Sequence, residues 1–153
     1  MECRLRPATN RDREFLYRLH CRTMREVIER TWGWDDDWQV KDFDRRMGAC
    51  QVFVIDVGEE PIGGLMLDLT ADTLDIVELQ ILPEHQRQGI GTWVIERVIE
   101  DAKRRGLRIT LSVVPANSDA KRLYERIGFS AAGVDQPFIR MRYGRSGLNS
   151  SSG

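Results

Sequence analysis

The chain has 153 residues, of which 41% are apolar and 31% are charged. This length fits one domain, with enough buried surface for a core that needs no disulfide or metal. The 23 Lys and Arg residues balance 24 Asp and Glu residues, so the formal net charge is −1. Dedicated nucleic-acid binders usually carry a basic excess, and no apolar run here is long enough to span a membrane. Neither a nucleic acid nor a membrane is expected as a partner.

The cysteines and histidines exclude further kinds of site. Cys3, Cys21 and Cys50 are far apart in sequence, and neither a CxxC motif nor a Cys/His cluster occurs. A disulfide framework, a zinc site or another metal site is therefore not expected. Free thiols, together with an N-terminus that lacks a secretory signal, predict a cytoplasmic protein. His20 and His85 are the only histidines, and their separation does not suggest a histidine-based triad.

Hydrophobic periodicity predicts two helices and four strands in the first half of the chain. The helices rest on apolar residues at near-helical spacing, and the strands on β-rich runs bounded by Gly, Pro and Asp. Thr9 or Asn10 is suited to cap the first helix. The predicted elements are a strand at 3–6, helices at 11–30 and 37–47, a hairpin of strands 51–57 and 62–69, and a strand at 74–82.

The second half of the chain predicts alternating helices and strands. Apolar residues recur every four positions between 90 and 102, and Gly106 suits a left-handed C-cap. The predicted elements are a helix at 89–105, a strand at 107–114, a helix at 118–127, and strands at 129–134 and 138–143. The order β-α-α-β-β-β-α-β-α-β-β indicates a mixed α/β (α+β) fold with one right-handed crossover. Residues 144–153 are Gly/Ser-rich and are expected to form a disordered tail.

The most informative segment runs from Glu78 to Thr92. There a strand ends, a polar loop turns, and Gly89 and Gly91 open an amphipathic helix. A helix start exposes backbone N–H groups and positive dipole charge, and glycines let a phosphate approach the main chain. No lysine follows Gly91, and Val94 replaces the third glycine of a dinucleotide fingerprint. The segment therefore predicts a pyrophosphate site that is neither a Walker loop nor a dinucleotide motif.

A second motif follows the next predicted strand. Residues 86–91 read Gln-x-x-Gly-x-Gly, and residues 117–129 read Asn-x-x-Ala-x-x-Leu-Tyr-x-x-x-Gly-Phe. Together these motifs resemble the GNAT superfamily of acyl-CoA-dependent N-acetyltransferases. The resemblance covers residues 75–129, and the predicted order of elements agrees outside that stretch. It implies a single GNAT domain over residues 1–143, with a centrally splayed mixed sheet flanked by helices.

The resemblance implies a binding site for acetyl-CoA. Main-chain groups of the strand that holds Leu79, Ile81 and Leu82 would pair with the pantetheine arm. Pro115 would help the two central strands part, and Asn117 would contact the arm at that opening. Backbone amides of the loop would hold the pyrophosphate, and the loop residues are Gln86, Arg87, Gln88, Gly89, Ile90, Gly91 and Thr92.

The resemblance also implies catalytic roles. The N–H of Leu79 would donate to the thioester carbonyl and stabilise the developing oxyanion. Tyr124 occupies the position of a tyrosine proposed as general acid in many relatives, where it would meet the cofactor sulfur; the alternative is a packing role beside Phe129. Glu78 is the first candidate for the general base, and simple strand alternation places it on the same face as Ile76. The alternative for Glu78 is a solvated or ion-paired carboxylate, with water as the base.

Residues 32–38 join the first two predicted helices and interleave three tryptophans with three aspartates. In GNAT relatives this loop helps to form the acceptor pocket. Aromatic faces and carboxylates favour a cationic amine, so Trp32, Trp34 and Asp35 are predicted to bind the acceptor. The alternative is that the tryptophans are buried against the sheet while Asp35 or Asp36 caps the second helix.

The sequence thus predicts an enzyme that moves an acetyl group directly from acetyl-CoA to a primary amine, on a cationic small molecule or a peptide. No cysteine lies in the motifs, so an acyl-enzyme is not expected. Two alternatives remain on the same fold: a non-catalytic acyl-CoA-binding regulatory module, and an adaptor that uses exposed tryptophans. Pairing of the C-terminal strands between two copies would give a homodimer.

Overall fold

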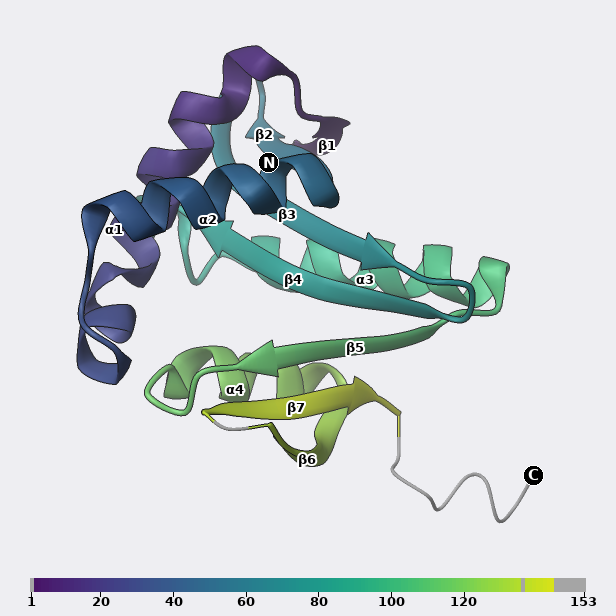
Figure 1. The fold of residues 1–153 in the computed structure, drawn as a ribbon. Coiled ribbons are helices and arrows are strands. Elements are labelled where there is room, and N and C mark those ends of the chain that lie inside the picture. Colours follow the sequence, from purple (N-terminus) through teal and green to yellow (C-terminus); the bar gives the residue numbers. More distant parts are fainter. Residues whose placement is uncertain (1, 136, 145–153) are drawn as a thin grey trace.

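The computed structural model describes residues 2–135 and 137–144 (Figure 1). These residues contain one seven-stranded sheet in the order β1-β2-β3-β4-β5-β7-β6. Its strands are β1 (Cys3–Pro7), β2 (Gln51–Val57), β3 (Glu60–Leu69), β4 (Thr73–Ile81), β5 (Arg108–Val113), β6 (Phe129–Asp135) and β7 (Phe138–Tyr143). The α-helices are α1 (Arg13–Thr31), α2 (Asp36–Ala49), α3 (Ile90–Arg105) and α4 (Ser118–Ile127), and the short 3₁₀ helices are η1 (Asn10–Asp12) and η2 (Pro83–His85).

The predicted fold class and order of elements are confirmed. Local sequence signals account for several boundaries: Thr9 and Asp12 form a capping box at η1, and Gly106 ends α3 with φ 69°. The predicted disordered tail, residues 144–153, lies outside the described residues except for Gly144. Within the described part of the chain, no helix is both long enough and apolar enough to cross a membrane.

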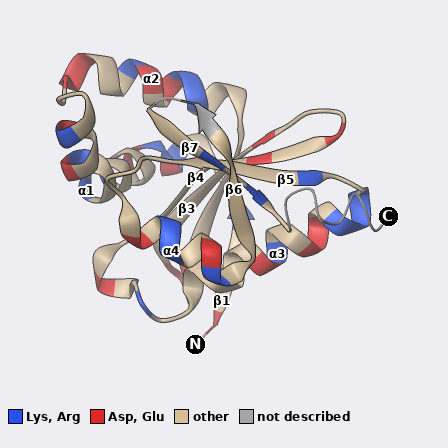
Figure 2. Cartoon of the chain, turned by 90° about the horizontal axis from the view of Figure 1, so that it is seen from below, with Lys and Arg blue, Asp and Glu red and all other residues tan. Residues whose placement is uncertain are grey.

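Two apolar clusters fill the two faces of the sheet. Helices α1 and α2 cover one face, and α3 and α4 cover the other (Figures 1 and 2). The cluster beneath α1 and α2 consists of Leu16, Leu19, Phe43, Val54 and Met66. The larger cluster beneath α3 and α4 includes Leu74, Ile76, Val94 and Tyr124, and Leu79 and Ile81 pack against its margin. The apolar side chains of β4 divide between the two clusters, because Val77 packs against the first and Leu74, Ile76, Leu79 and Ile81 belong to or pack against the second.

Strand β4 changes register along its length. It pairs with β3 so that Met66 opposes Glu78 and Leu67 opposes Ile76, which leaves Val77 as an extra, bulged residue. Its parallel pairing with β5 starts at Thr73 and Arg108 and ends at Ile76 and Leu111. Beyond that point the two strands diverge, as Figure 1 shows. We call the stretch of β4 from Val77 to Ile81 its free edge.

Two sequence-based expectations about β4 were wrong. The strands part beside the bulge at Val77, before β5 reaches Pro115, so the proline does not start the separation. The bulge also breaks the assumed alternation. Ile76 lies in the cluster under α3 and α4, whereas Glu78 turns to the opposite face and contacts residues of α1 and α2.

Close approach of β3 to β4 requires glycine at one position. A Cβ placed on Gly63 would lie 2.6 Å from the backbone oxygen of Gln80, a distance that real Cβ atoms essentially never show. The missing side chain at Gly63 therefore lets the two strands pair closely opposite the free edge.

Candidate active site

The backbone groups of Leu79 and Ile81 point away from β3. The N–H of Leu82 donates to the carbonyl of Ile62 on β3 at 2.8 Å. Backbone groups of successive strand residues alternate in direction, so those of Gln80 face β3, and those of Leu79 and Ile81 face the other way. The side-chain amide of Gln86 confirms this direction, because its Nε2 donates to the Ile81 carbonyl at 2.8 Å. The free edge thus offers main-chain donors and acceptors where β5 has left the ladder.

The bulge is what gives these groups their direction. Before it, Ile76 pairs with β5 and its side chain lies under α3 and α4. One inserted residue shifts the alternation of all later positions by one. After the bulge, the odd-numbered residues direct their backbone groups away from β3 and their side chains toward α3 and α4. Leu79 therefore presents its N–H at the free edge, whereas an unbulged strand would direct this N–H into the pairing with β3.

The predicted pyrophosphate loop leads directly into α3. Gly89 has φ 82° and is the N-cap, and the first hydrogen bond of the helix runs from the N–H of Trp93 to the carbonyl of Gly89 at 3.0 Å. The N–H groups of the first turn have no intrahelical acceptor and carry the positive end of the dipole. Arg87, which is exposed, has φ 64° and adds a guanidinium to the same loop. The loop has the geometry and charge that hold a phosphate group.

Two residues of the second motif lie at α4. Tyr124 is 8% exposed and its ring meets that of Phe129 edge-on at 5.7 Å, so the predicted packing role is present. Burial raises the pKa of Tyr124 to about 12, which keeps its phenol protonated at neutral pH, as a general acid requires. The side-chain oxygen of Asn117 accepts from the N–H of Ala120 at 3.4 Å and caps α4.

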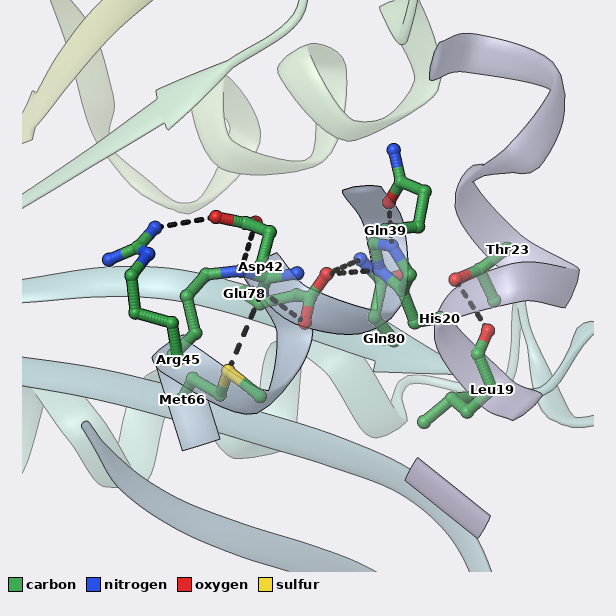
Figure 3. A network of polar contacts seen from close by, with 10 residues as sticks. Leu19, His20, Thr23, Gln39, Asp42, Arg45, Met66, Glu78 and Gln80 are labelled. Atoms are coloured by element: carbon green, nitrogen blue, oxygen red, sulfur yellow. Dashed lines mark hydrogen bonds and ion pairs between the residues drawn. The ribbon is translucent and has the colours of Figure 1, made fainter. Parts of the chain in front are cut away.

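Glu78 is held between two helices (Figure 3). Its Oε2 accepts from Nδ1 of His20 on α1 at 2.9 Å, and its Oε1 accepts from Nη1 of Arg46 on α2 at 3.0 Å. Arg46 is itself fixed by Asp42, with 3.0 Å between Nε and Oδ2. Nε2 of His20 lies 2.9 Å from Oε1 of Gln39. Both carboxylate oxygens of Glu78 are therefore engaged by donors.

The electrostatics of Glu78 bear on its predicted role as the general base. Burial by itself would raise the pKa of Glu78, but the hydrogen bond from His20 and the charge of Arg46 outweigh burial and hold the pKa below its usual range. A carboxylate with a lowered pKa and two bound donors is a poor proton acceptor. The geometry shows the ion-paired carboxylate that the alternative predicts.

The loop between α1 and α2 both caps α2, through Asp35, and exposes aromatic surface. Asp35 is the N-cap of α2 and accepts from the N–H of Trp38 at 3.0 Å, as the capping alternative predicts. The tryptophans, however, are not all buried, because Trp32 is 53% exposed and Trp38 is 59% exposed. Trp32 packs on Phe138 of β7 with 5.6 Å between ring centroids. The loop therefore reaches across to the C-terminal strands with exposed aromatic surface.

Trp34 connects this loop to the Glu78 cluster. Its ring lies 5.8 Å from that of His20 and beneath the guanidinium of Arg25, 4.9 Å from the ring centroid. Its Nε1 donates to Asp36 at 2.7 Å.

The sequence did not predict the roles of His20, Gln39 and Arg46, although one signal was available. Leu16, Leu19 and His20 have the spacing of one helix face, and a polar residue in an apolar stripe needs a partner.

The comparisons with known proteins agree with this arrangement. A sequence model of the acetyltransferase (GNAT) family matches residues 13–129. The chain belongs to the GNAT family. The match extends from α1 to the start of β6 and includes the free edge, the loop before α3 and both residues discussed on α4.

The relatives similar to this GNAT chain are named as N-acetyltransferases. An uncharacterised N-acetyltransferase of Methanocaldococcus jannaschii is 34% identical over 97 residues, which are 58% of this chain and 43% of that protein. The match thus spans less than half of that relative. The ribosomal protein bS18-alanine N-acetyltransferase of Escherichia coli K12 is 26% identical over 110 residues, 71% of this chain and 74% of that protein.

Solved structures share the fold. The PaiA N-acetyltransferase of Thermoplasma acidophilum, crystallised with coenzyme A, has a TM-score of 0.76 at 16% identity and covers 95% of this chain and 100% of its own. An acetyltransferase of Thermus thermophilus has a TM-score of 0.74 at 23% identity, with 93% and 96% covered. Family and relatives confirm the predicted enzyme class, an acetyl-CoA-dependent N-acyltransferase. Residues 2–135 and 137–144 contain no cluster of His, Cys, Asp and Glu that could hold a metal.

Substitutions at Gly91 test the phosphate loop. A Cβ at Gly91 would make only ordinary contacts, 3.4 Å from Leu123 and 3.6 Å from Ile81, so Gly91→Ala should fold and bind acetyl-CoA. Gly91→Glu adds bulk and negative charge at the start of α3. In the wild type, acetyl-CoA at a hundred times Kd should stabilise the fold by about 2.7 kcal/mol and raise Tm, and Gly91→Glu should abolish this rise. An undiminished shift in Gly91→Glu would show that the phosphate is held elsewhere.

The ion pair of Glu78 predicts a pH-dependent stability. Above the usual glutamate pKa of about 4.3, Glu78→Gln should lower the free energy of unfolding by about 2 kcal/mol, because a buried charged hydrogen bond is lost. Since the native pKa is lowered, this difference should persist down to the unfolded-state pKa of about 4.3. It should then shrink as the pH falls from there through the lower native pKa. Urea unfolding from pH 7 to pH 3 measures it. The exposed Glu84→Gln is the control, and a difference that stays constant over this range would contradict the ion pair.

Proposed function

We propose that this GNAT protein transfers an acetyl group from acetyl-CoA directly to a primary amine of a cationic peptide or small molecule. The observation that carries the proposal is the free edge of β4, where the bulge turns the N–H of Leu79 toward the place that β5 has left. The pyrophosphate loop begins only a few residues later, and Gln86 ties it to Ile81. One continuous segment can therefore hold both ends of the cofactor.

The chain's own groups supply the cofactor site. The main-chain groups of Leu79 and Ile81 are proposed to pair with the pantetheine amides, and Leu82 follows them at the end of the edge. The amides of the first turn of α3 and the side chain of Arg87 are proposed to hold the pyrophosphate. Asn117, whose oxygen caps α4, retains its side-chain NH₂ group to contact the arm.

Two residues are proposed to act on the reacting atoms. As the amine nitrogen bonds to the thioester carbonyl carbon, the N–H of Leu79 stabilises the negative charge that develops on the oxygen. When the carbon–sulfur bond breaks, the phenol of Tyr124 gives its proton to the departing sulfur. The ammonium proton passes to water, because Glu78 is occupied by His20 and Arg46.

The proposed acceptor is a cationic amine. The loop from Trp32 to Asp37 offers exposed aromatic surface and three carboxylates, which together attract an ammonium group. Asp35 accepts from one backbone N–H with Oδ1, and its carboxylate group stands next to Trp34 in the chain. Among cationic amines the N-terminus of a peptide is the first candidate, because the Escherichia coli relative is named as an alanine N-acetyltransferase of a ribosomal protein.

An acceptor panel tests this function. Coenzyme A release should occur with at least one cationic amine among a peptide with N-terminal alanine, lysine, a polyamine and an aminoglycoside. Trp32→Ala should raise the acceptor KM about threefold, the effect expected from losing an exposed cation–π contact of about 0.5–1 kcal/mol. Asp35→Asn should also raise it while keeping the α2 cap, because asparagine caps as well as aspartate.

The two rival functions give other results in the same panel. Binding of acetyl-CoA without release of coenzyme A for any amine would favour the non-catalytic regulatory module. The absence of an acetyl-CoA thermal shift would favour the adaptor. An unchanged acceptor KM in both variants would move the acceptor site away from this loop.

Substitution of Tyr124 separates its catalytic and packing roles. Tyr124→Phe keeps the ring that packs on Phe129 and removes the proton donor. We expect kcat to fall by about 10²-fold, the usual contribution of a general acid, with little change in the KM for acetyl-CoA or in Tm. Equal losses in turnover and in cofactor affinity would assign Tyr124 a packing role.

We also propose that the protein works in the cytoplasm, which the free thiols of Cys3, Cys21 and Cys50 support.

A homodimer through the C-terminal strands remains a prediction that gel filtration with light scattering would test.

A further inference from the structure

We propose that His20 is a positioning residue for acetyl transfer, which holds Glu78 beside the bulge of β4 and thereby fixes the direction of the Leu79 N–H. The inference rests on the proposed function, in which that N–H stabilises the oxyanion. His20 is 3% exposed, so it acts through its neighbours and not on the substrate.

The orientation of His20 is determined by its contacts. Glu78 is ionised and can only accept, so Nδ1 of His20 donates to its Oε2, at 2.9 Å. Nε2 lies 2.9 Å from Oε1 of Gln39, a side chain that is 4% exposed. The rings of Tyr17, Trp34 and Phe43 surround the imidazole, with centroids 5.7 to 6.2 Å away. Figure 3 shows His20 between Gln39 and Glu78.

His20 and Arg46 bind the carboxylate of Glu78 from opposite sides. Arg46 holds the other oxygen of Glu78 from α2, and Asp42 fixes Arg46. If His20 donated no hydrogen bond, the carboxylate would keep the bond from Arg46 and only a long contact, 3.4 Å, from Nε2 of Gln80 to the oxygen that His20 holds. A cavity of about 10 Å³, close to the least that holds one water, adjoins Glu78, so the packing around the carboxylate is not complete. Leu79 is the next residue in the chain after Glu78 and would move with it.

Stability alone does not account for this cluster. Buried ion pairs are often no more stabilising than apolar residues of similar volume. The polar cluster lies at the one point where β4 carries its extra residue and leaves β5. The charged or titratable groups that surround His20 and Glu78 are Tyr17 and Arg25 on α1 and Asp42 and Arg46 on α2.

Two substitutions of His20 separate its hydrogen bond from its packing. His20→Phe keeps a ring among the aromatic neighbours but cannot donate to Glu78. His20→Asn loses the ring but places an amide N–H near the position of Nδ1. We expect kcat to fall about tenfold or more in the Phe variant and to stay within about threefold of wild type in the Asn variant, with the KM for acetyl-CoA nearly unchanged in both. Ile28→Val, at a buried position of the same helix that does not line this cavity, should lower Tm and leave kcat unchanged.

Two further readouts distinguish positioning from simple loss of structure. Loss of the donor that helps to hold the pKa of Glu78 down raises that pKa, so any fall of kcat on acidification should begin at a higher pH in His20→Phe than in the wild type. Independently of any acceptor, the NMR amide proton of Leu79 should move downfield when acetyl-CoA replaces coenzyme A, because the thioester carbonyl accepts its hydrogen bond. This change should be present in the wild type and in His20→Asn and absent in His20→Phe.

The outcomes separate this inference from the proposed acceptor. A Leu79 signal that responds in the wild type and not in His20→Phe supports the inference even if no amine on the panel is acetylated, in which case only the acceptor proposal fails. Wild-type kcat in His20→Phe, or equal losses in the Phe and Asn variants, would overturn it. A wild-type Leu79 amide that does not respond to the acetyl group would overturn both the inference and the oxyanion role.

Discussion

One extra residue in β4 determines what the rest of this fold can do. Without the bulge at Val77, the N–H of Leu79 would bond to β3 as part of an ordinary ladder, and the free edge would present different groups. With the bulge, Leu79 and Ile81 pack their side chains against the cluster under α3 and α4 while their backbone groups face away from β3, and of these the Ile81 carbonyl accepts from Gln86. A local irregularity in pairing thus changes a structural strand into a surface that can bind another extended chain.

The same irregularity requires a compensating structure on the other face. It places the carboxylate of Glu78 beneath α1 and α2, next to apolar side chains. A buried carboxylate is unfavourable unless it is paired and hydrogen-bonded, and His20 and Arg46 satisfy both oxygens. Because His20 also packs on Trp34, the stabilising cluster links the bulge to the loop proposed to receive the acceptor.

Most of the fold follows from the sequence because periodicity is a strong and local signal. The helix α3, with its repeat of apolar residues and its C-terminal glycine, is the clearest case. The pyrophosphate loop was predictable for a similar reason, since Gly89 and Gly91 precede a helix start. The bulge was also visible in principle: the apolar positions change from even numbers at Leu74 and Ile76 to odd numbers at Leu79 and Ile81. Simple alternation assumes one phase for the whole strand and therefore misplaced Glu78.

The polar cluster could not be predicted in the same way, because its members come from three elements that are distant in sequence. His20, Arg46 and Glu78 meet only once both helices pack on the sheet. This origin is also the reason to expect the cluster to affect turnover more than cofactor affinity. The phosphate end of the cofactor would be held by the start of α3, which Gln86 ties to Ile81 without any contribution from α1 or α2. The reacting end depends on the direction of a single N–H, and that direction depends on how α1 and α2 together hold the side chain of the preceding residue.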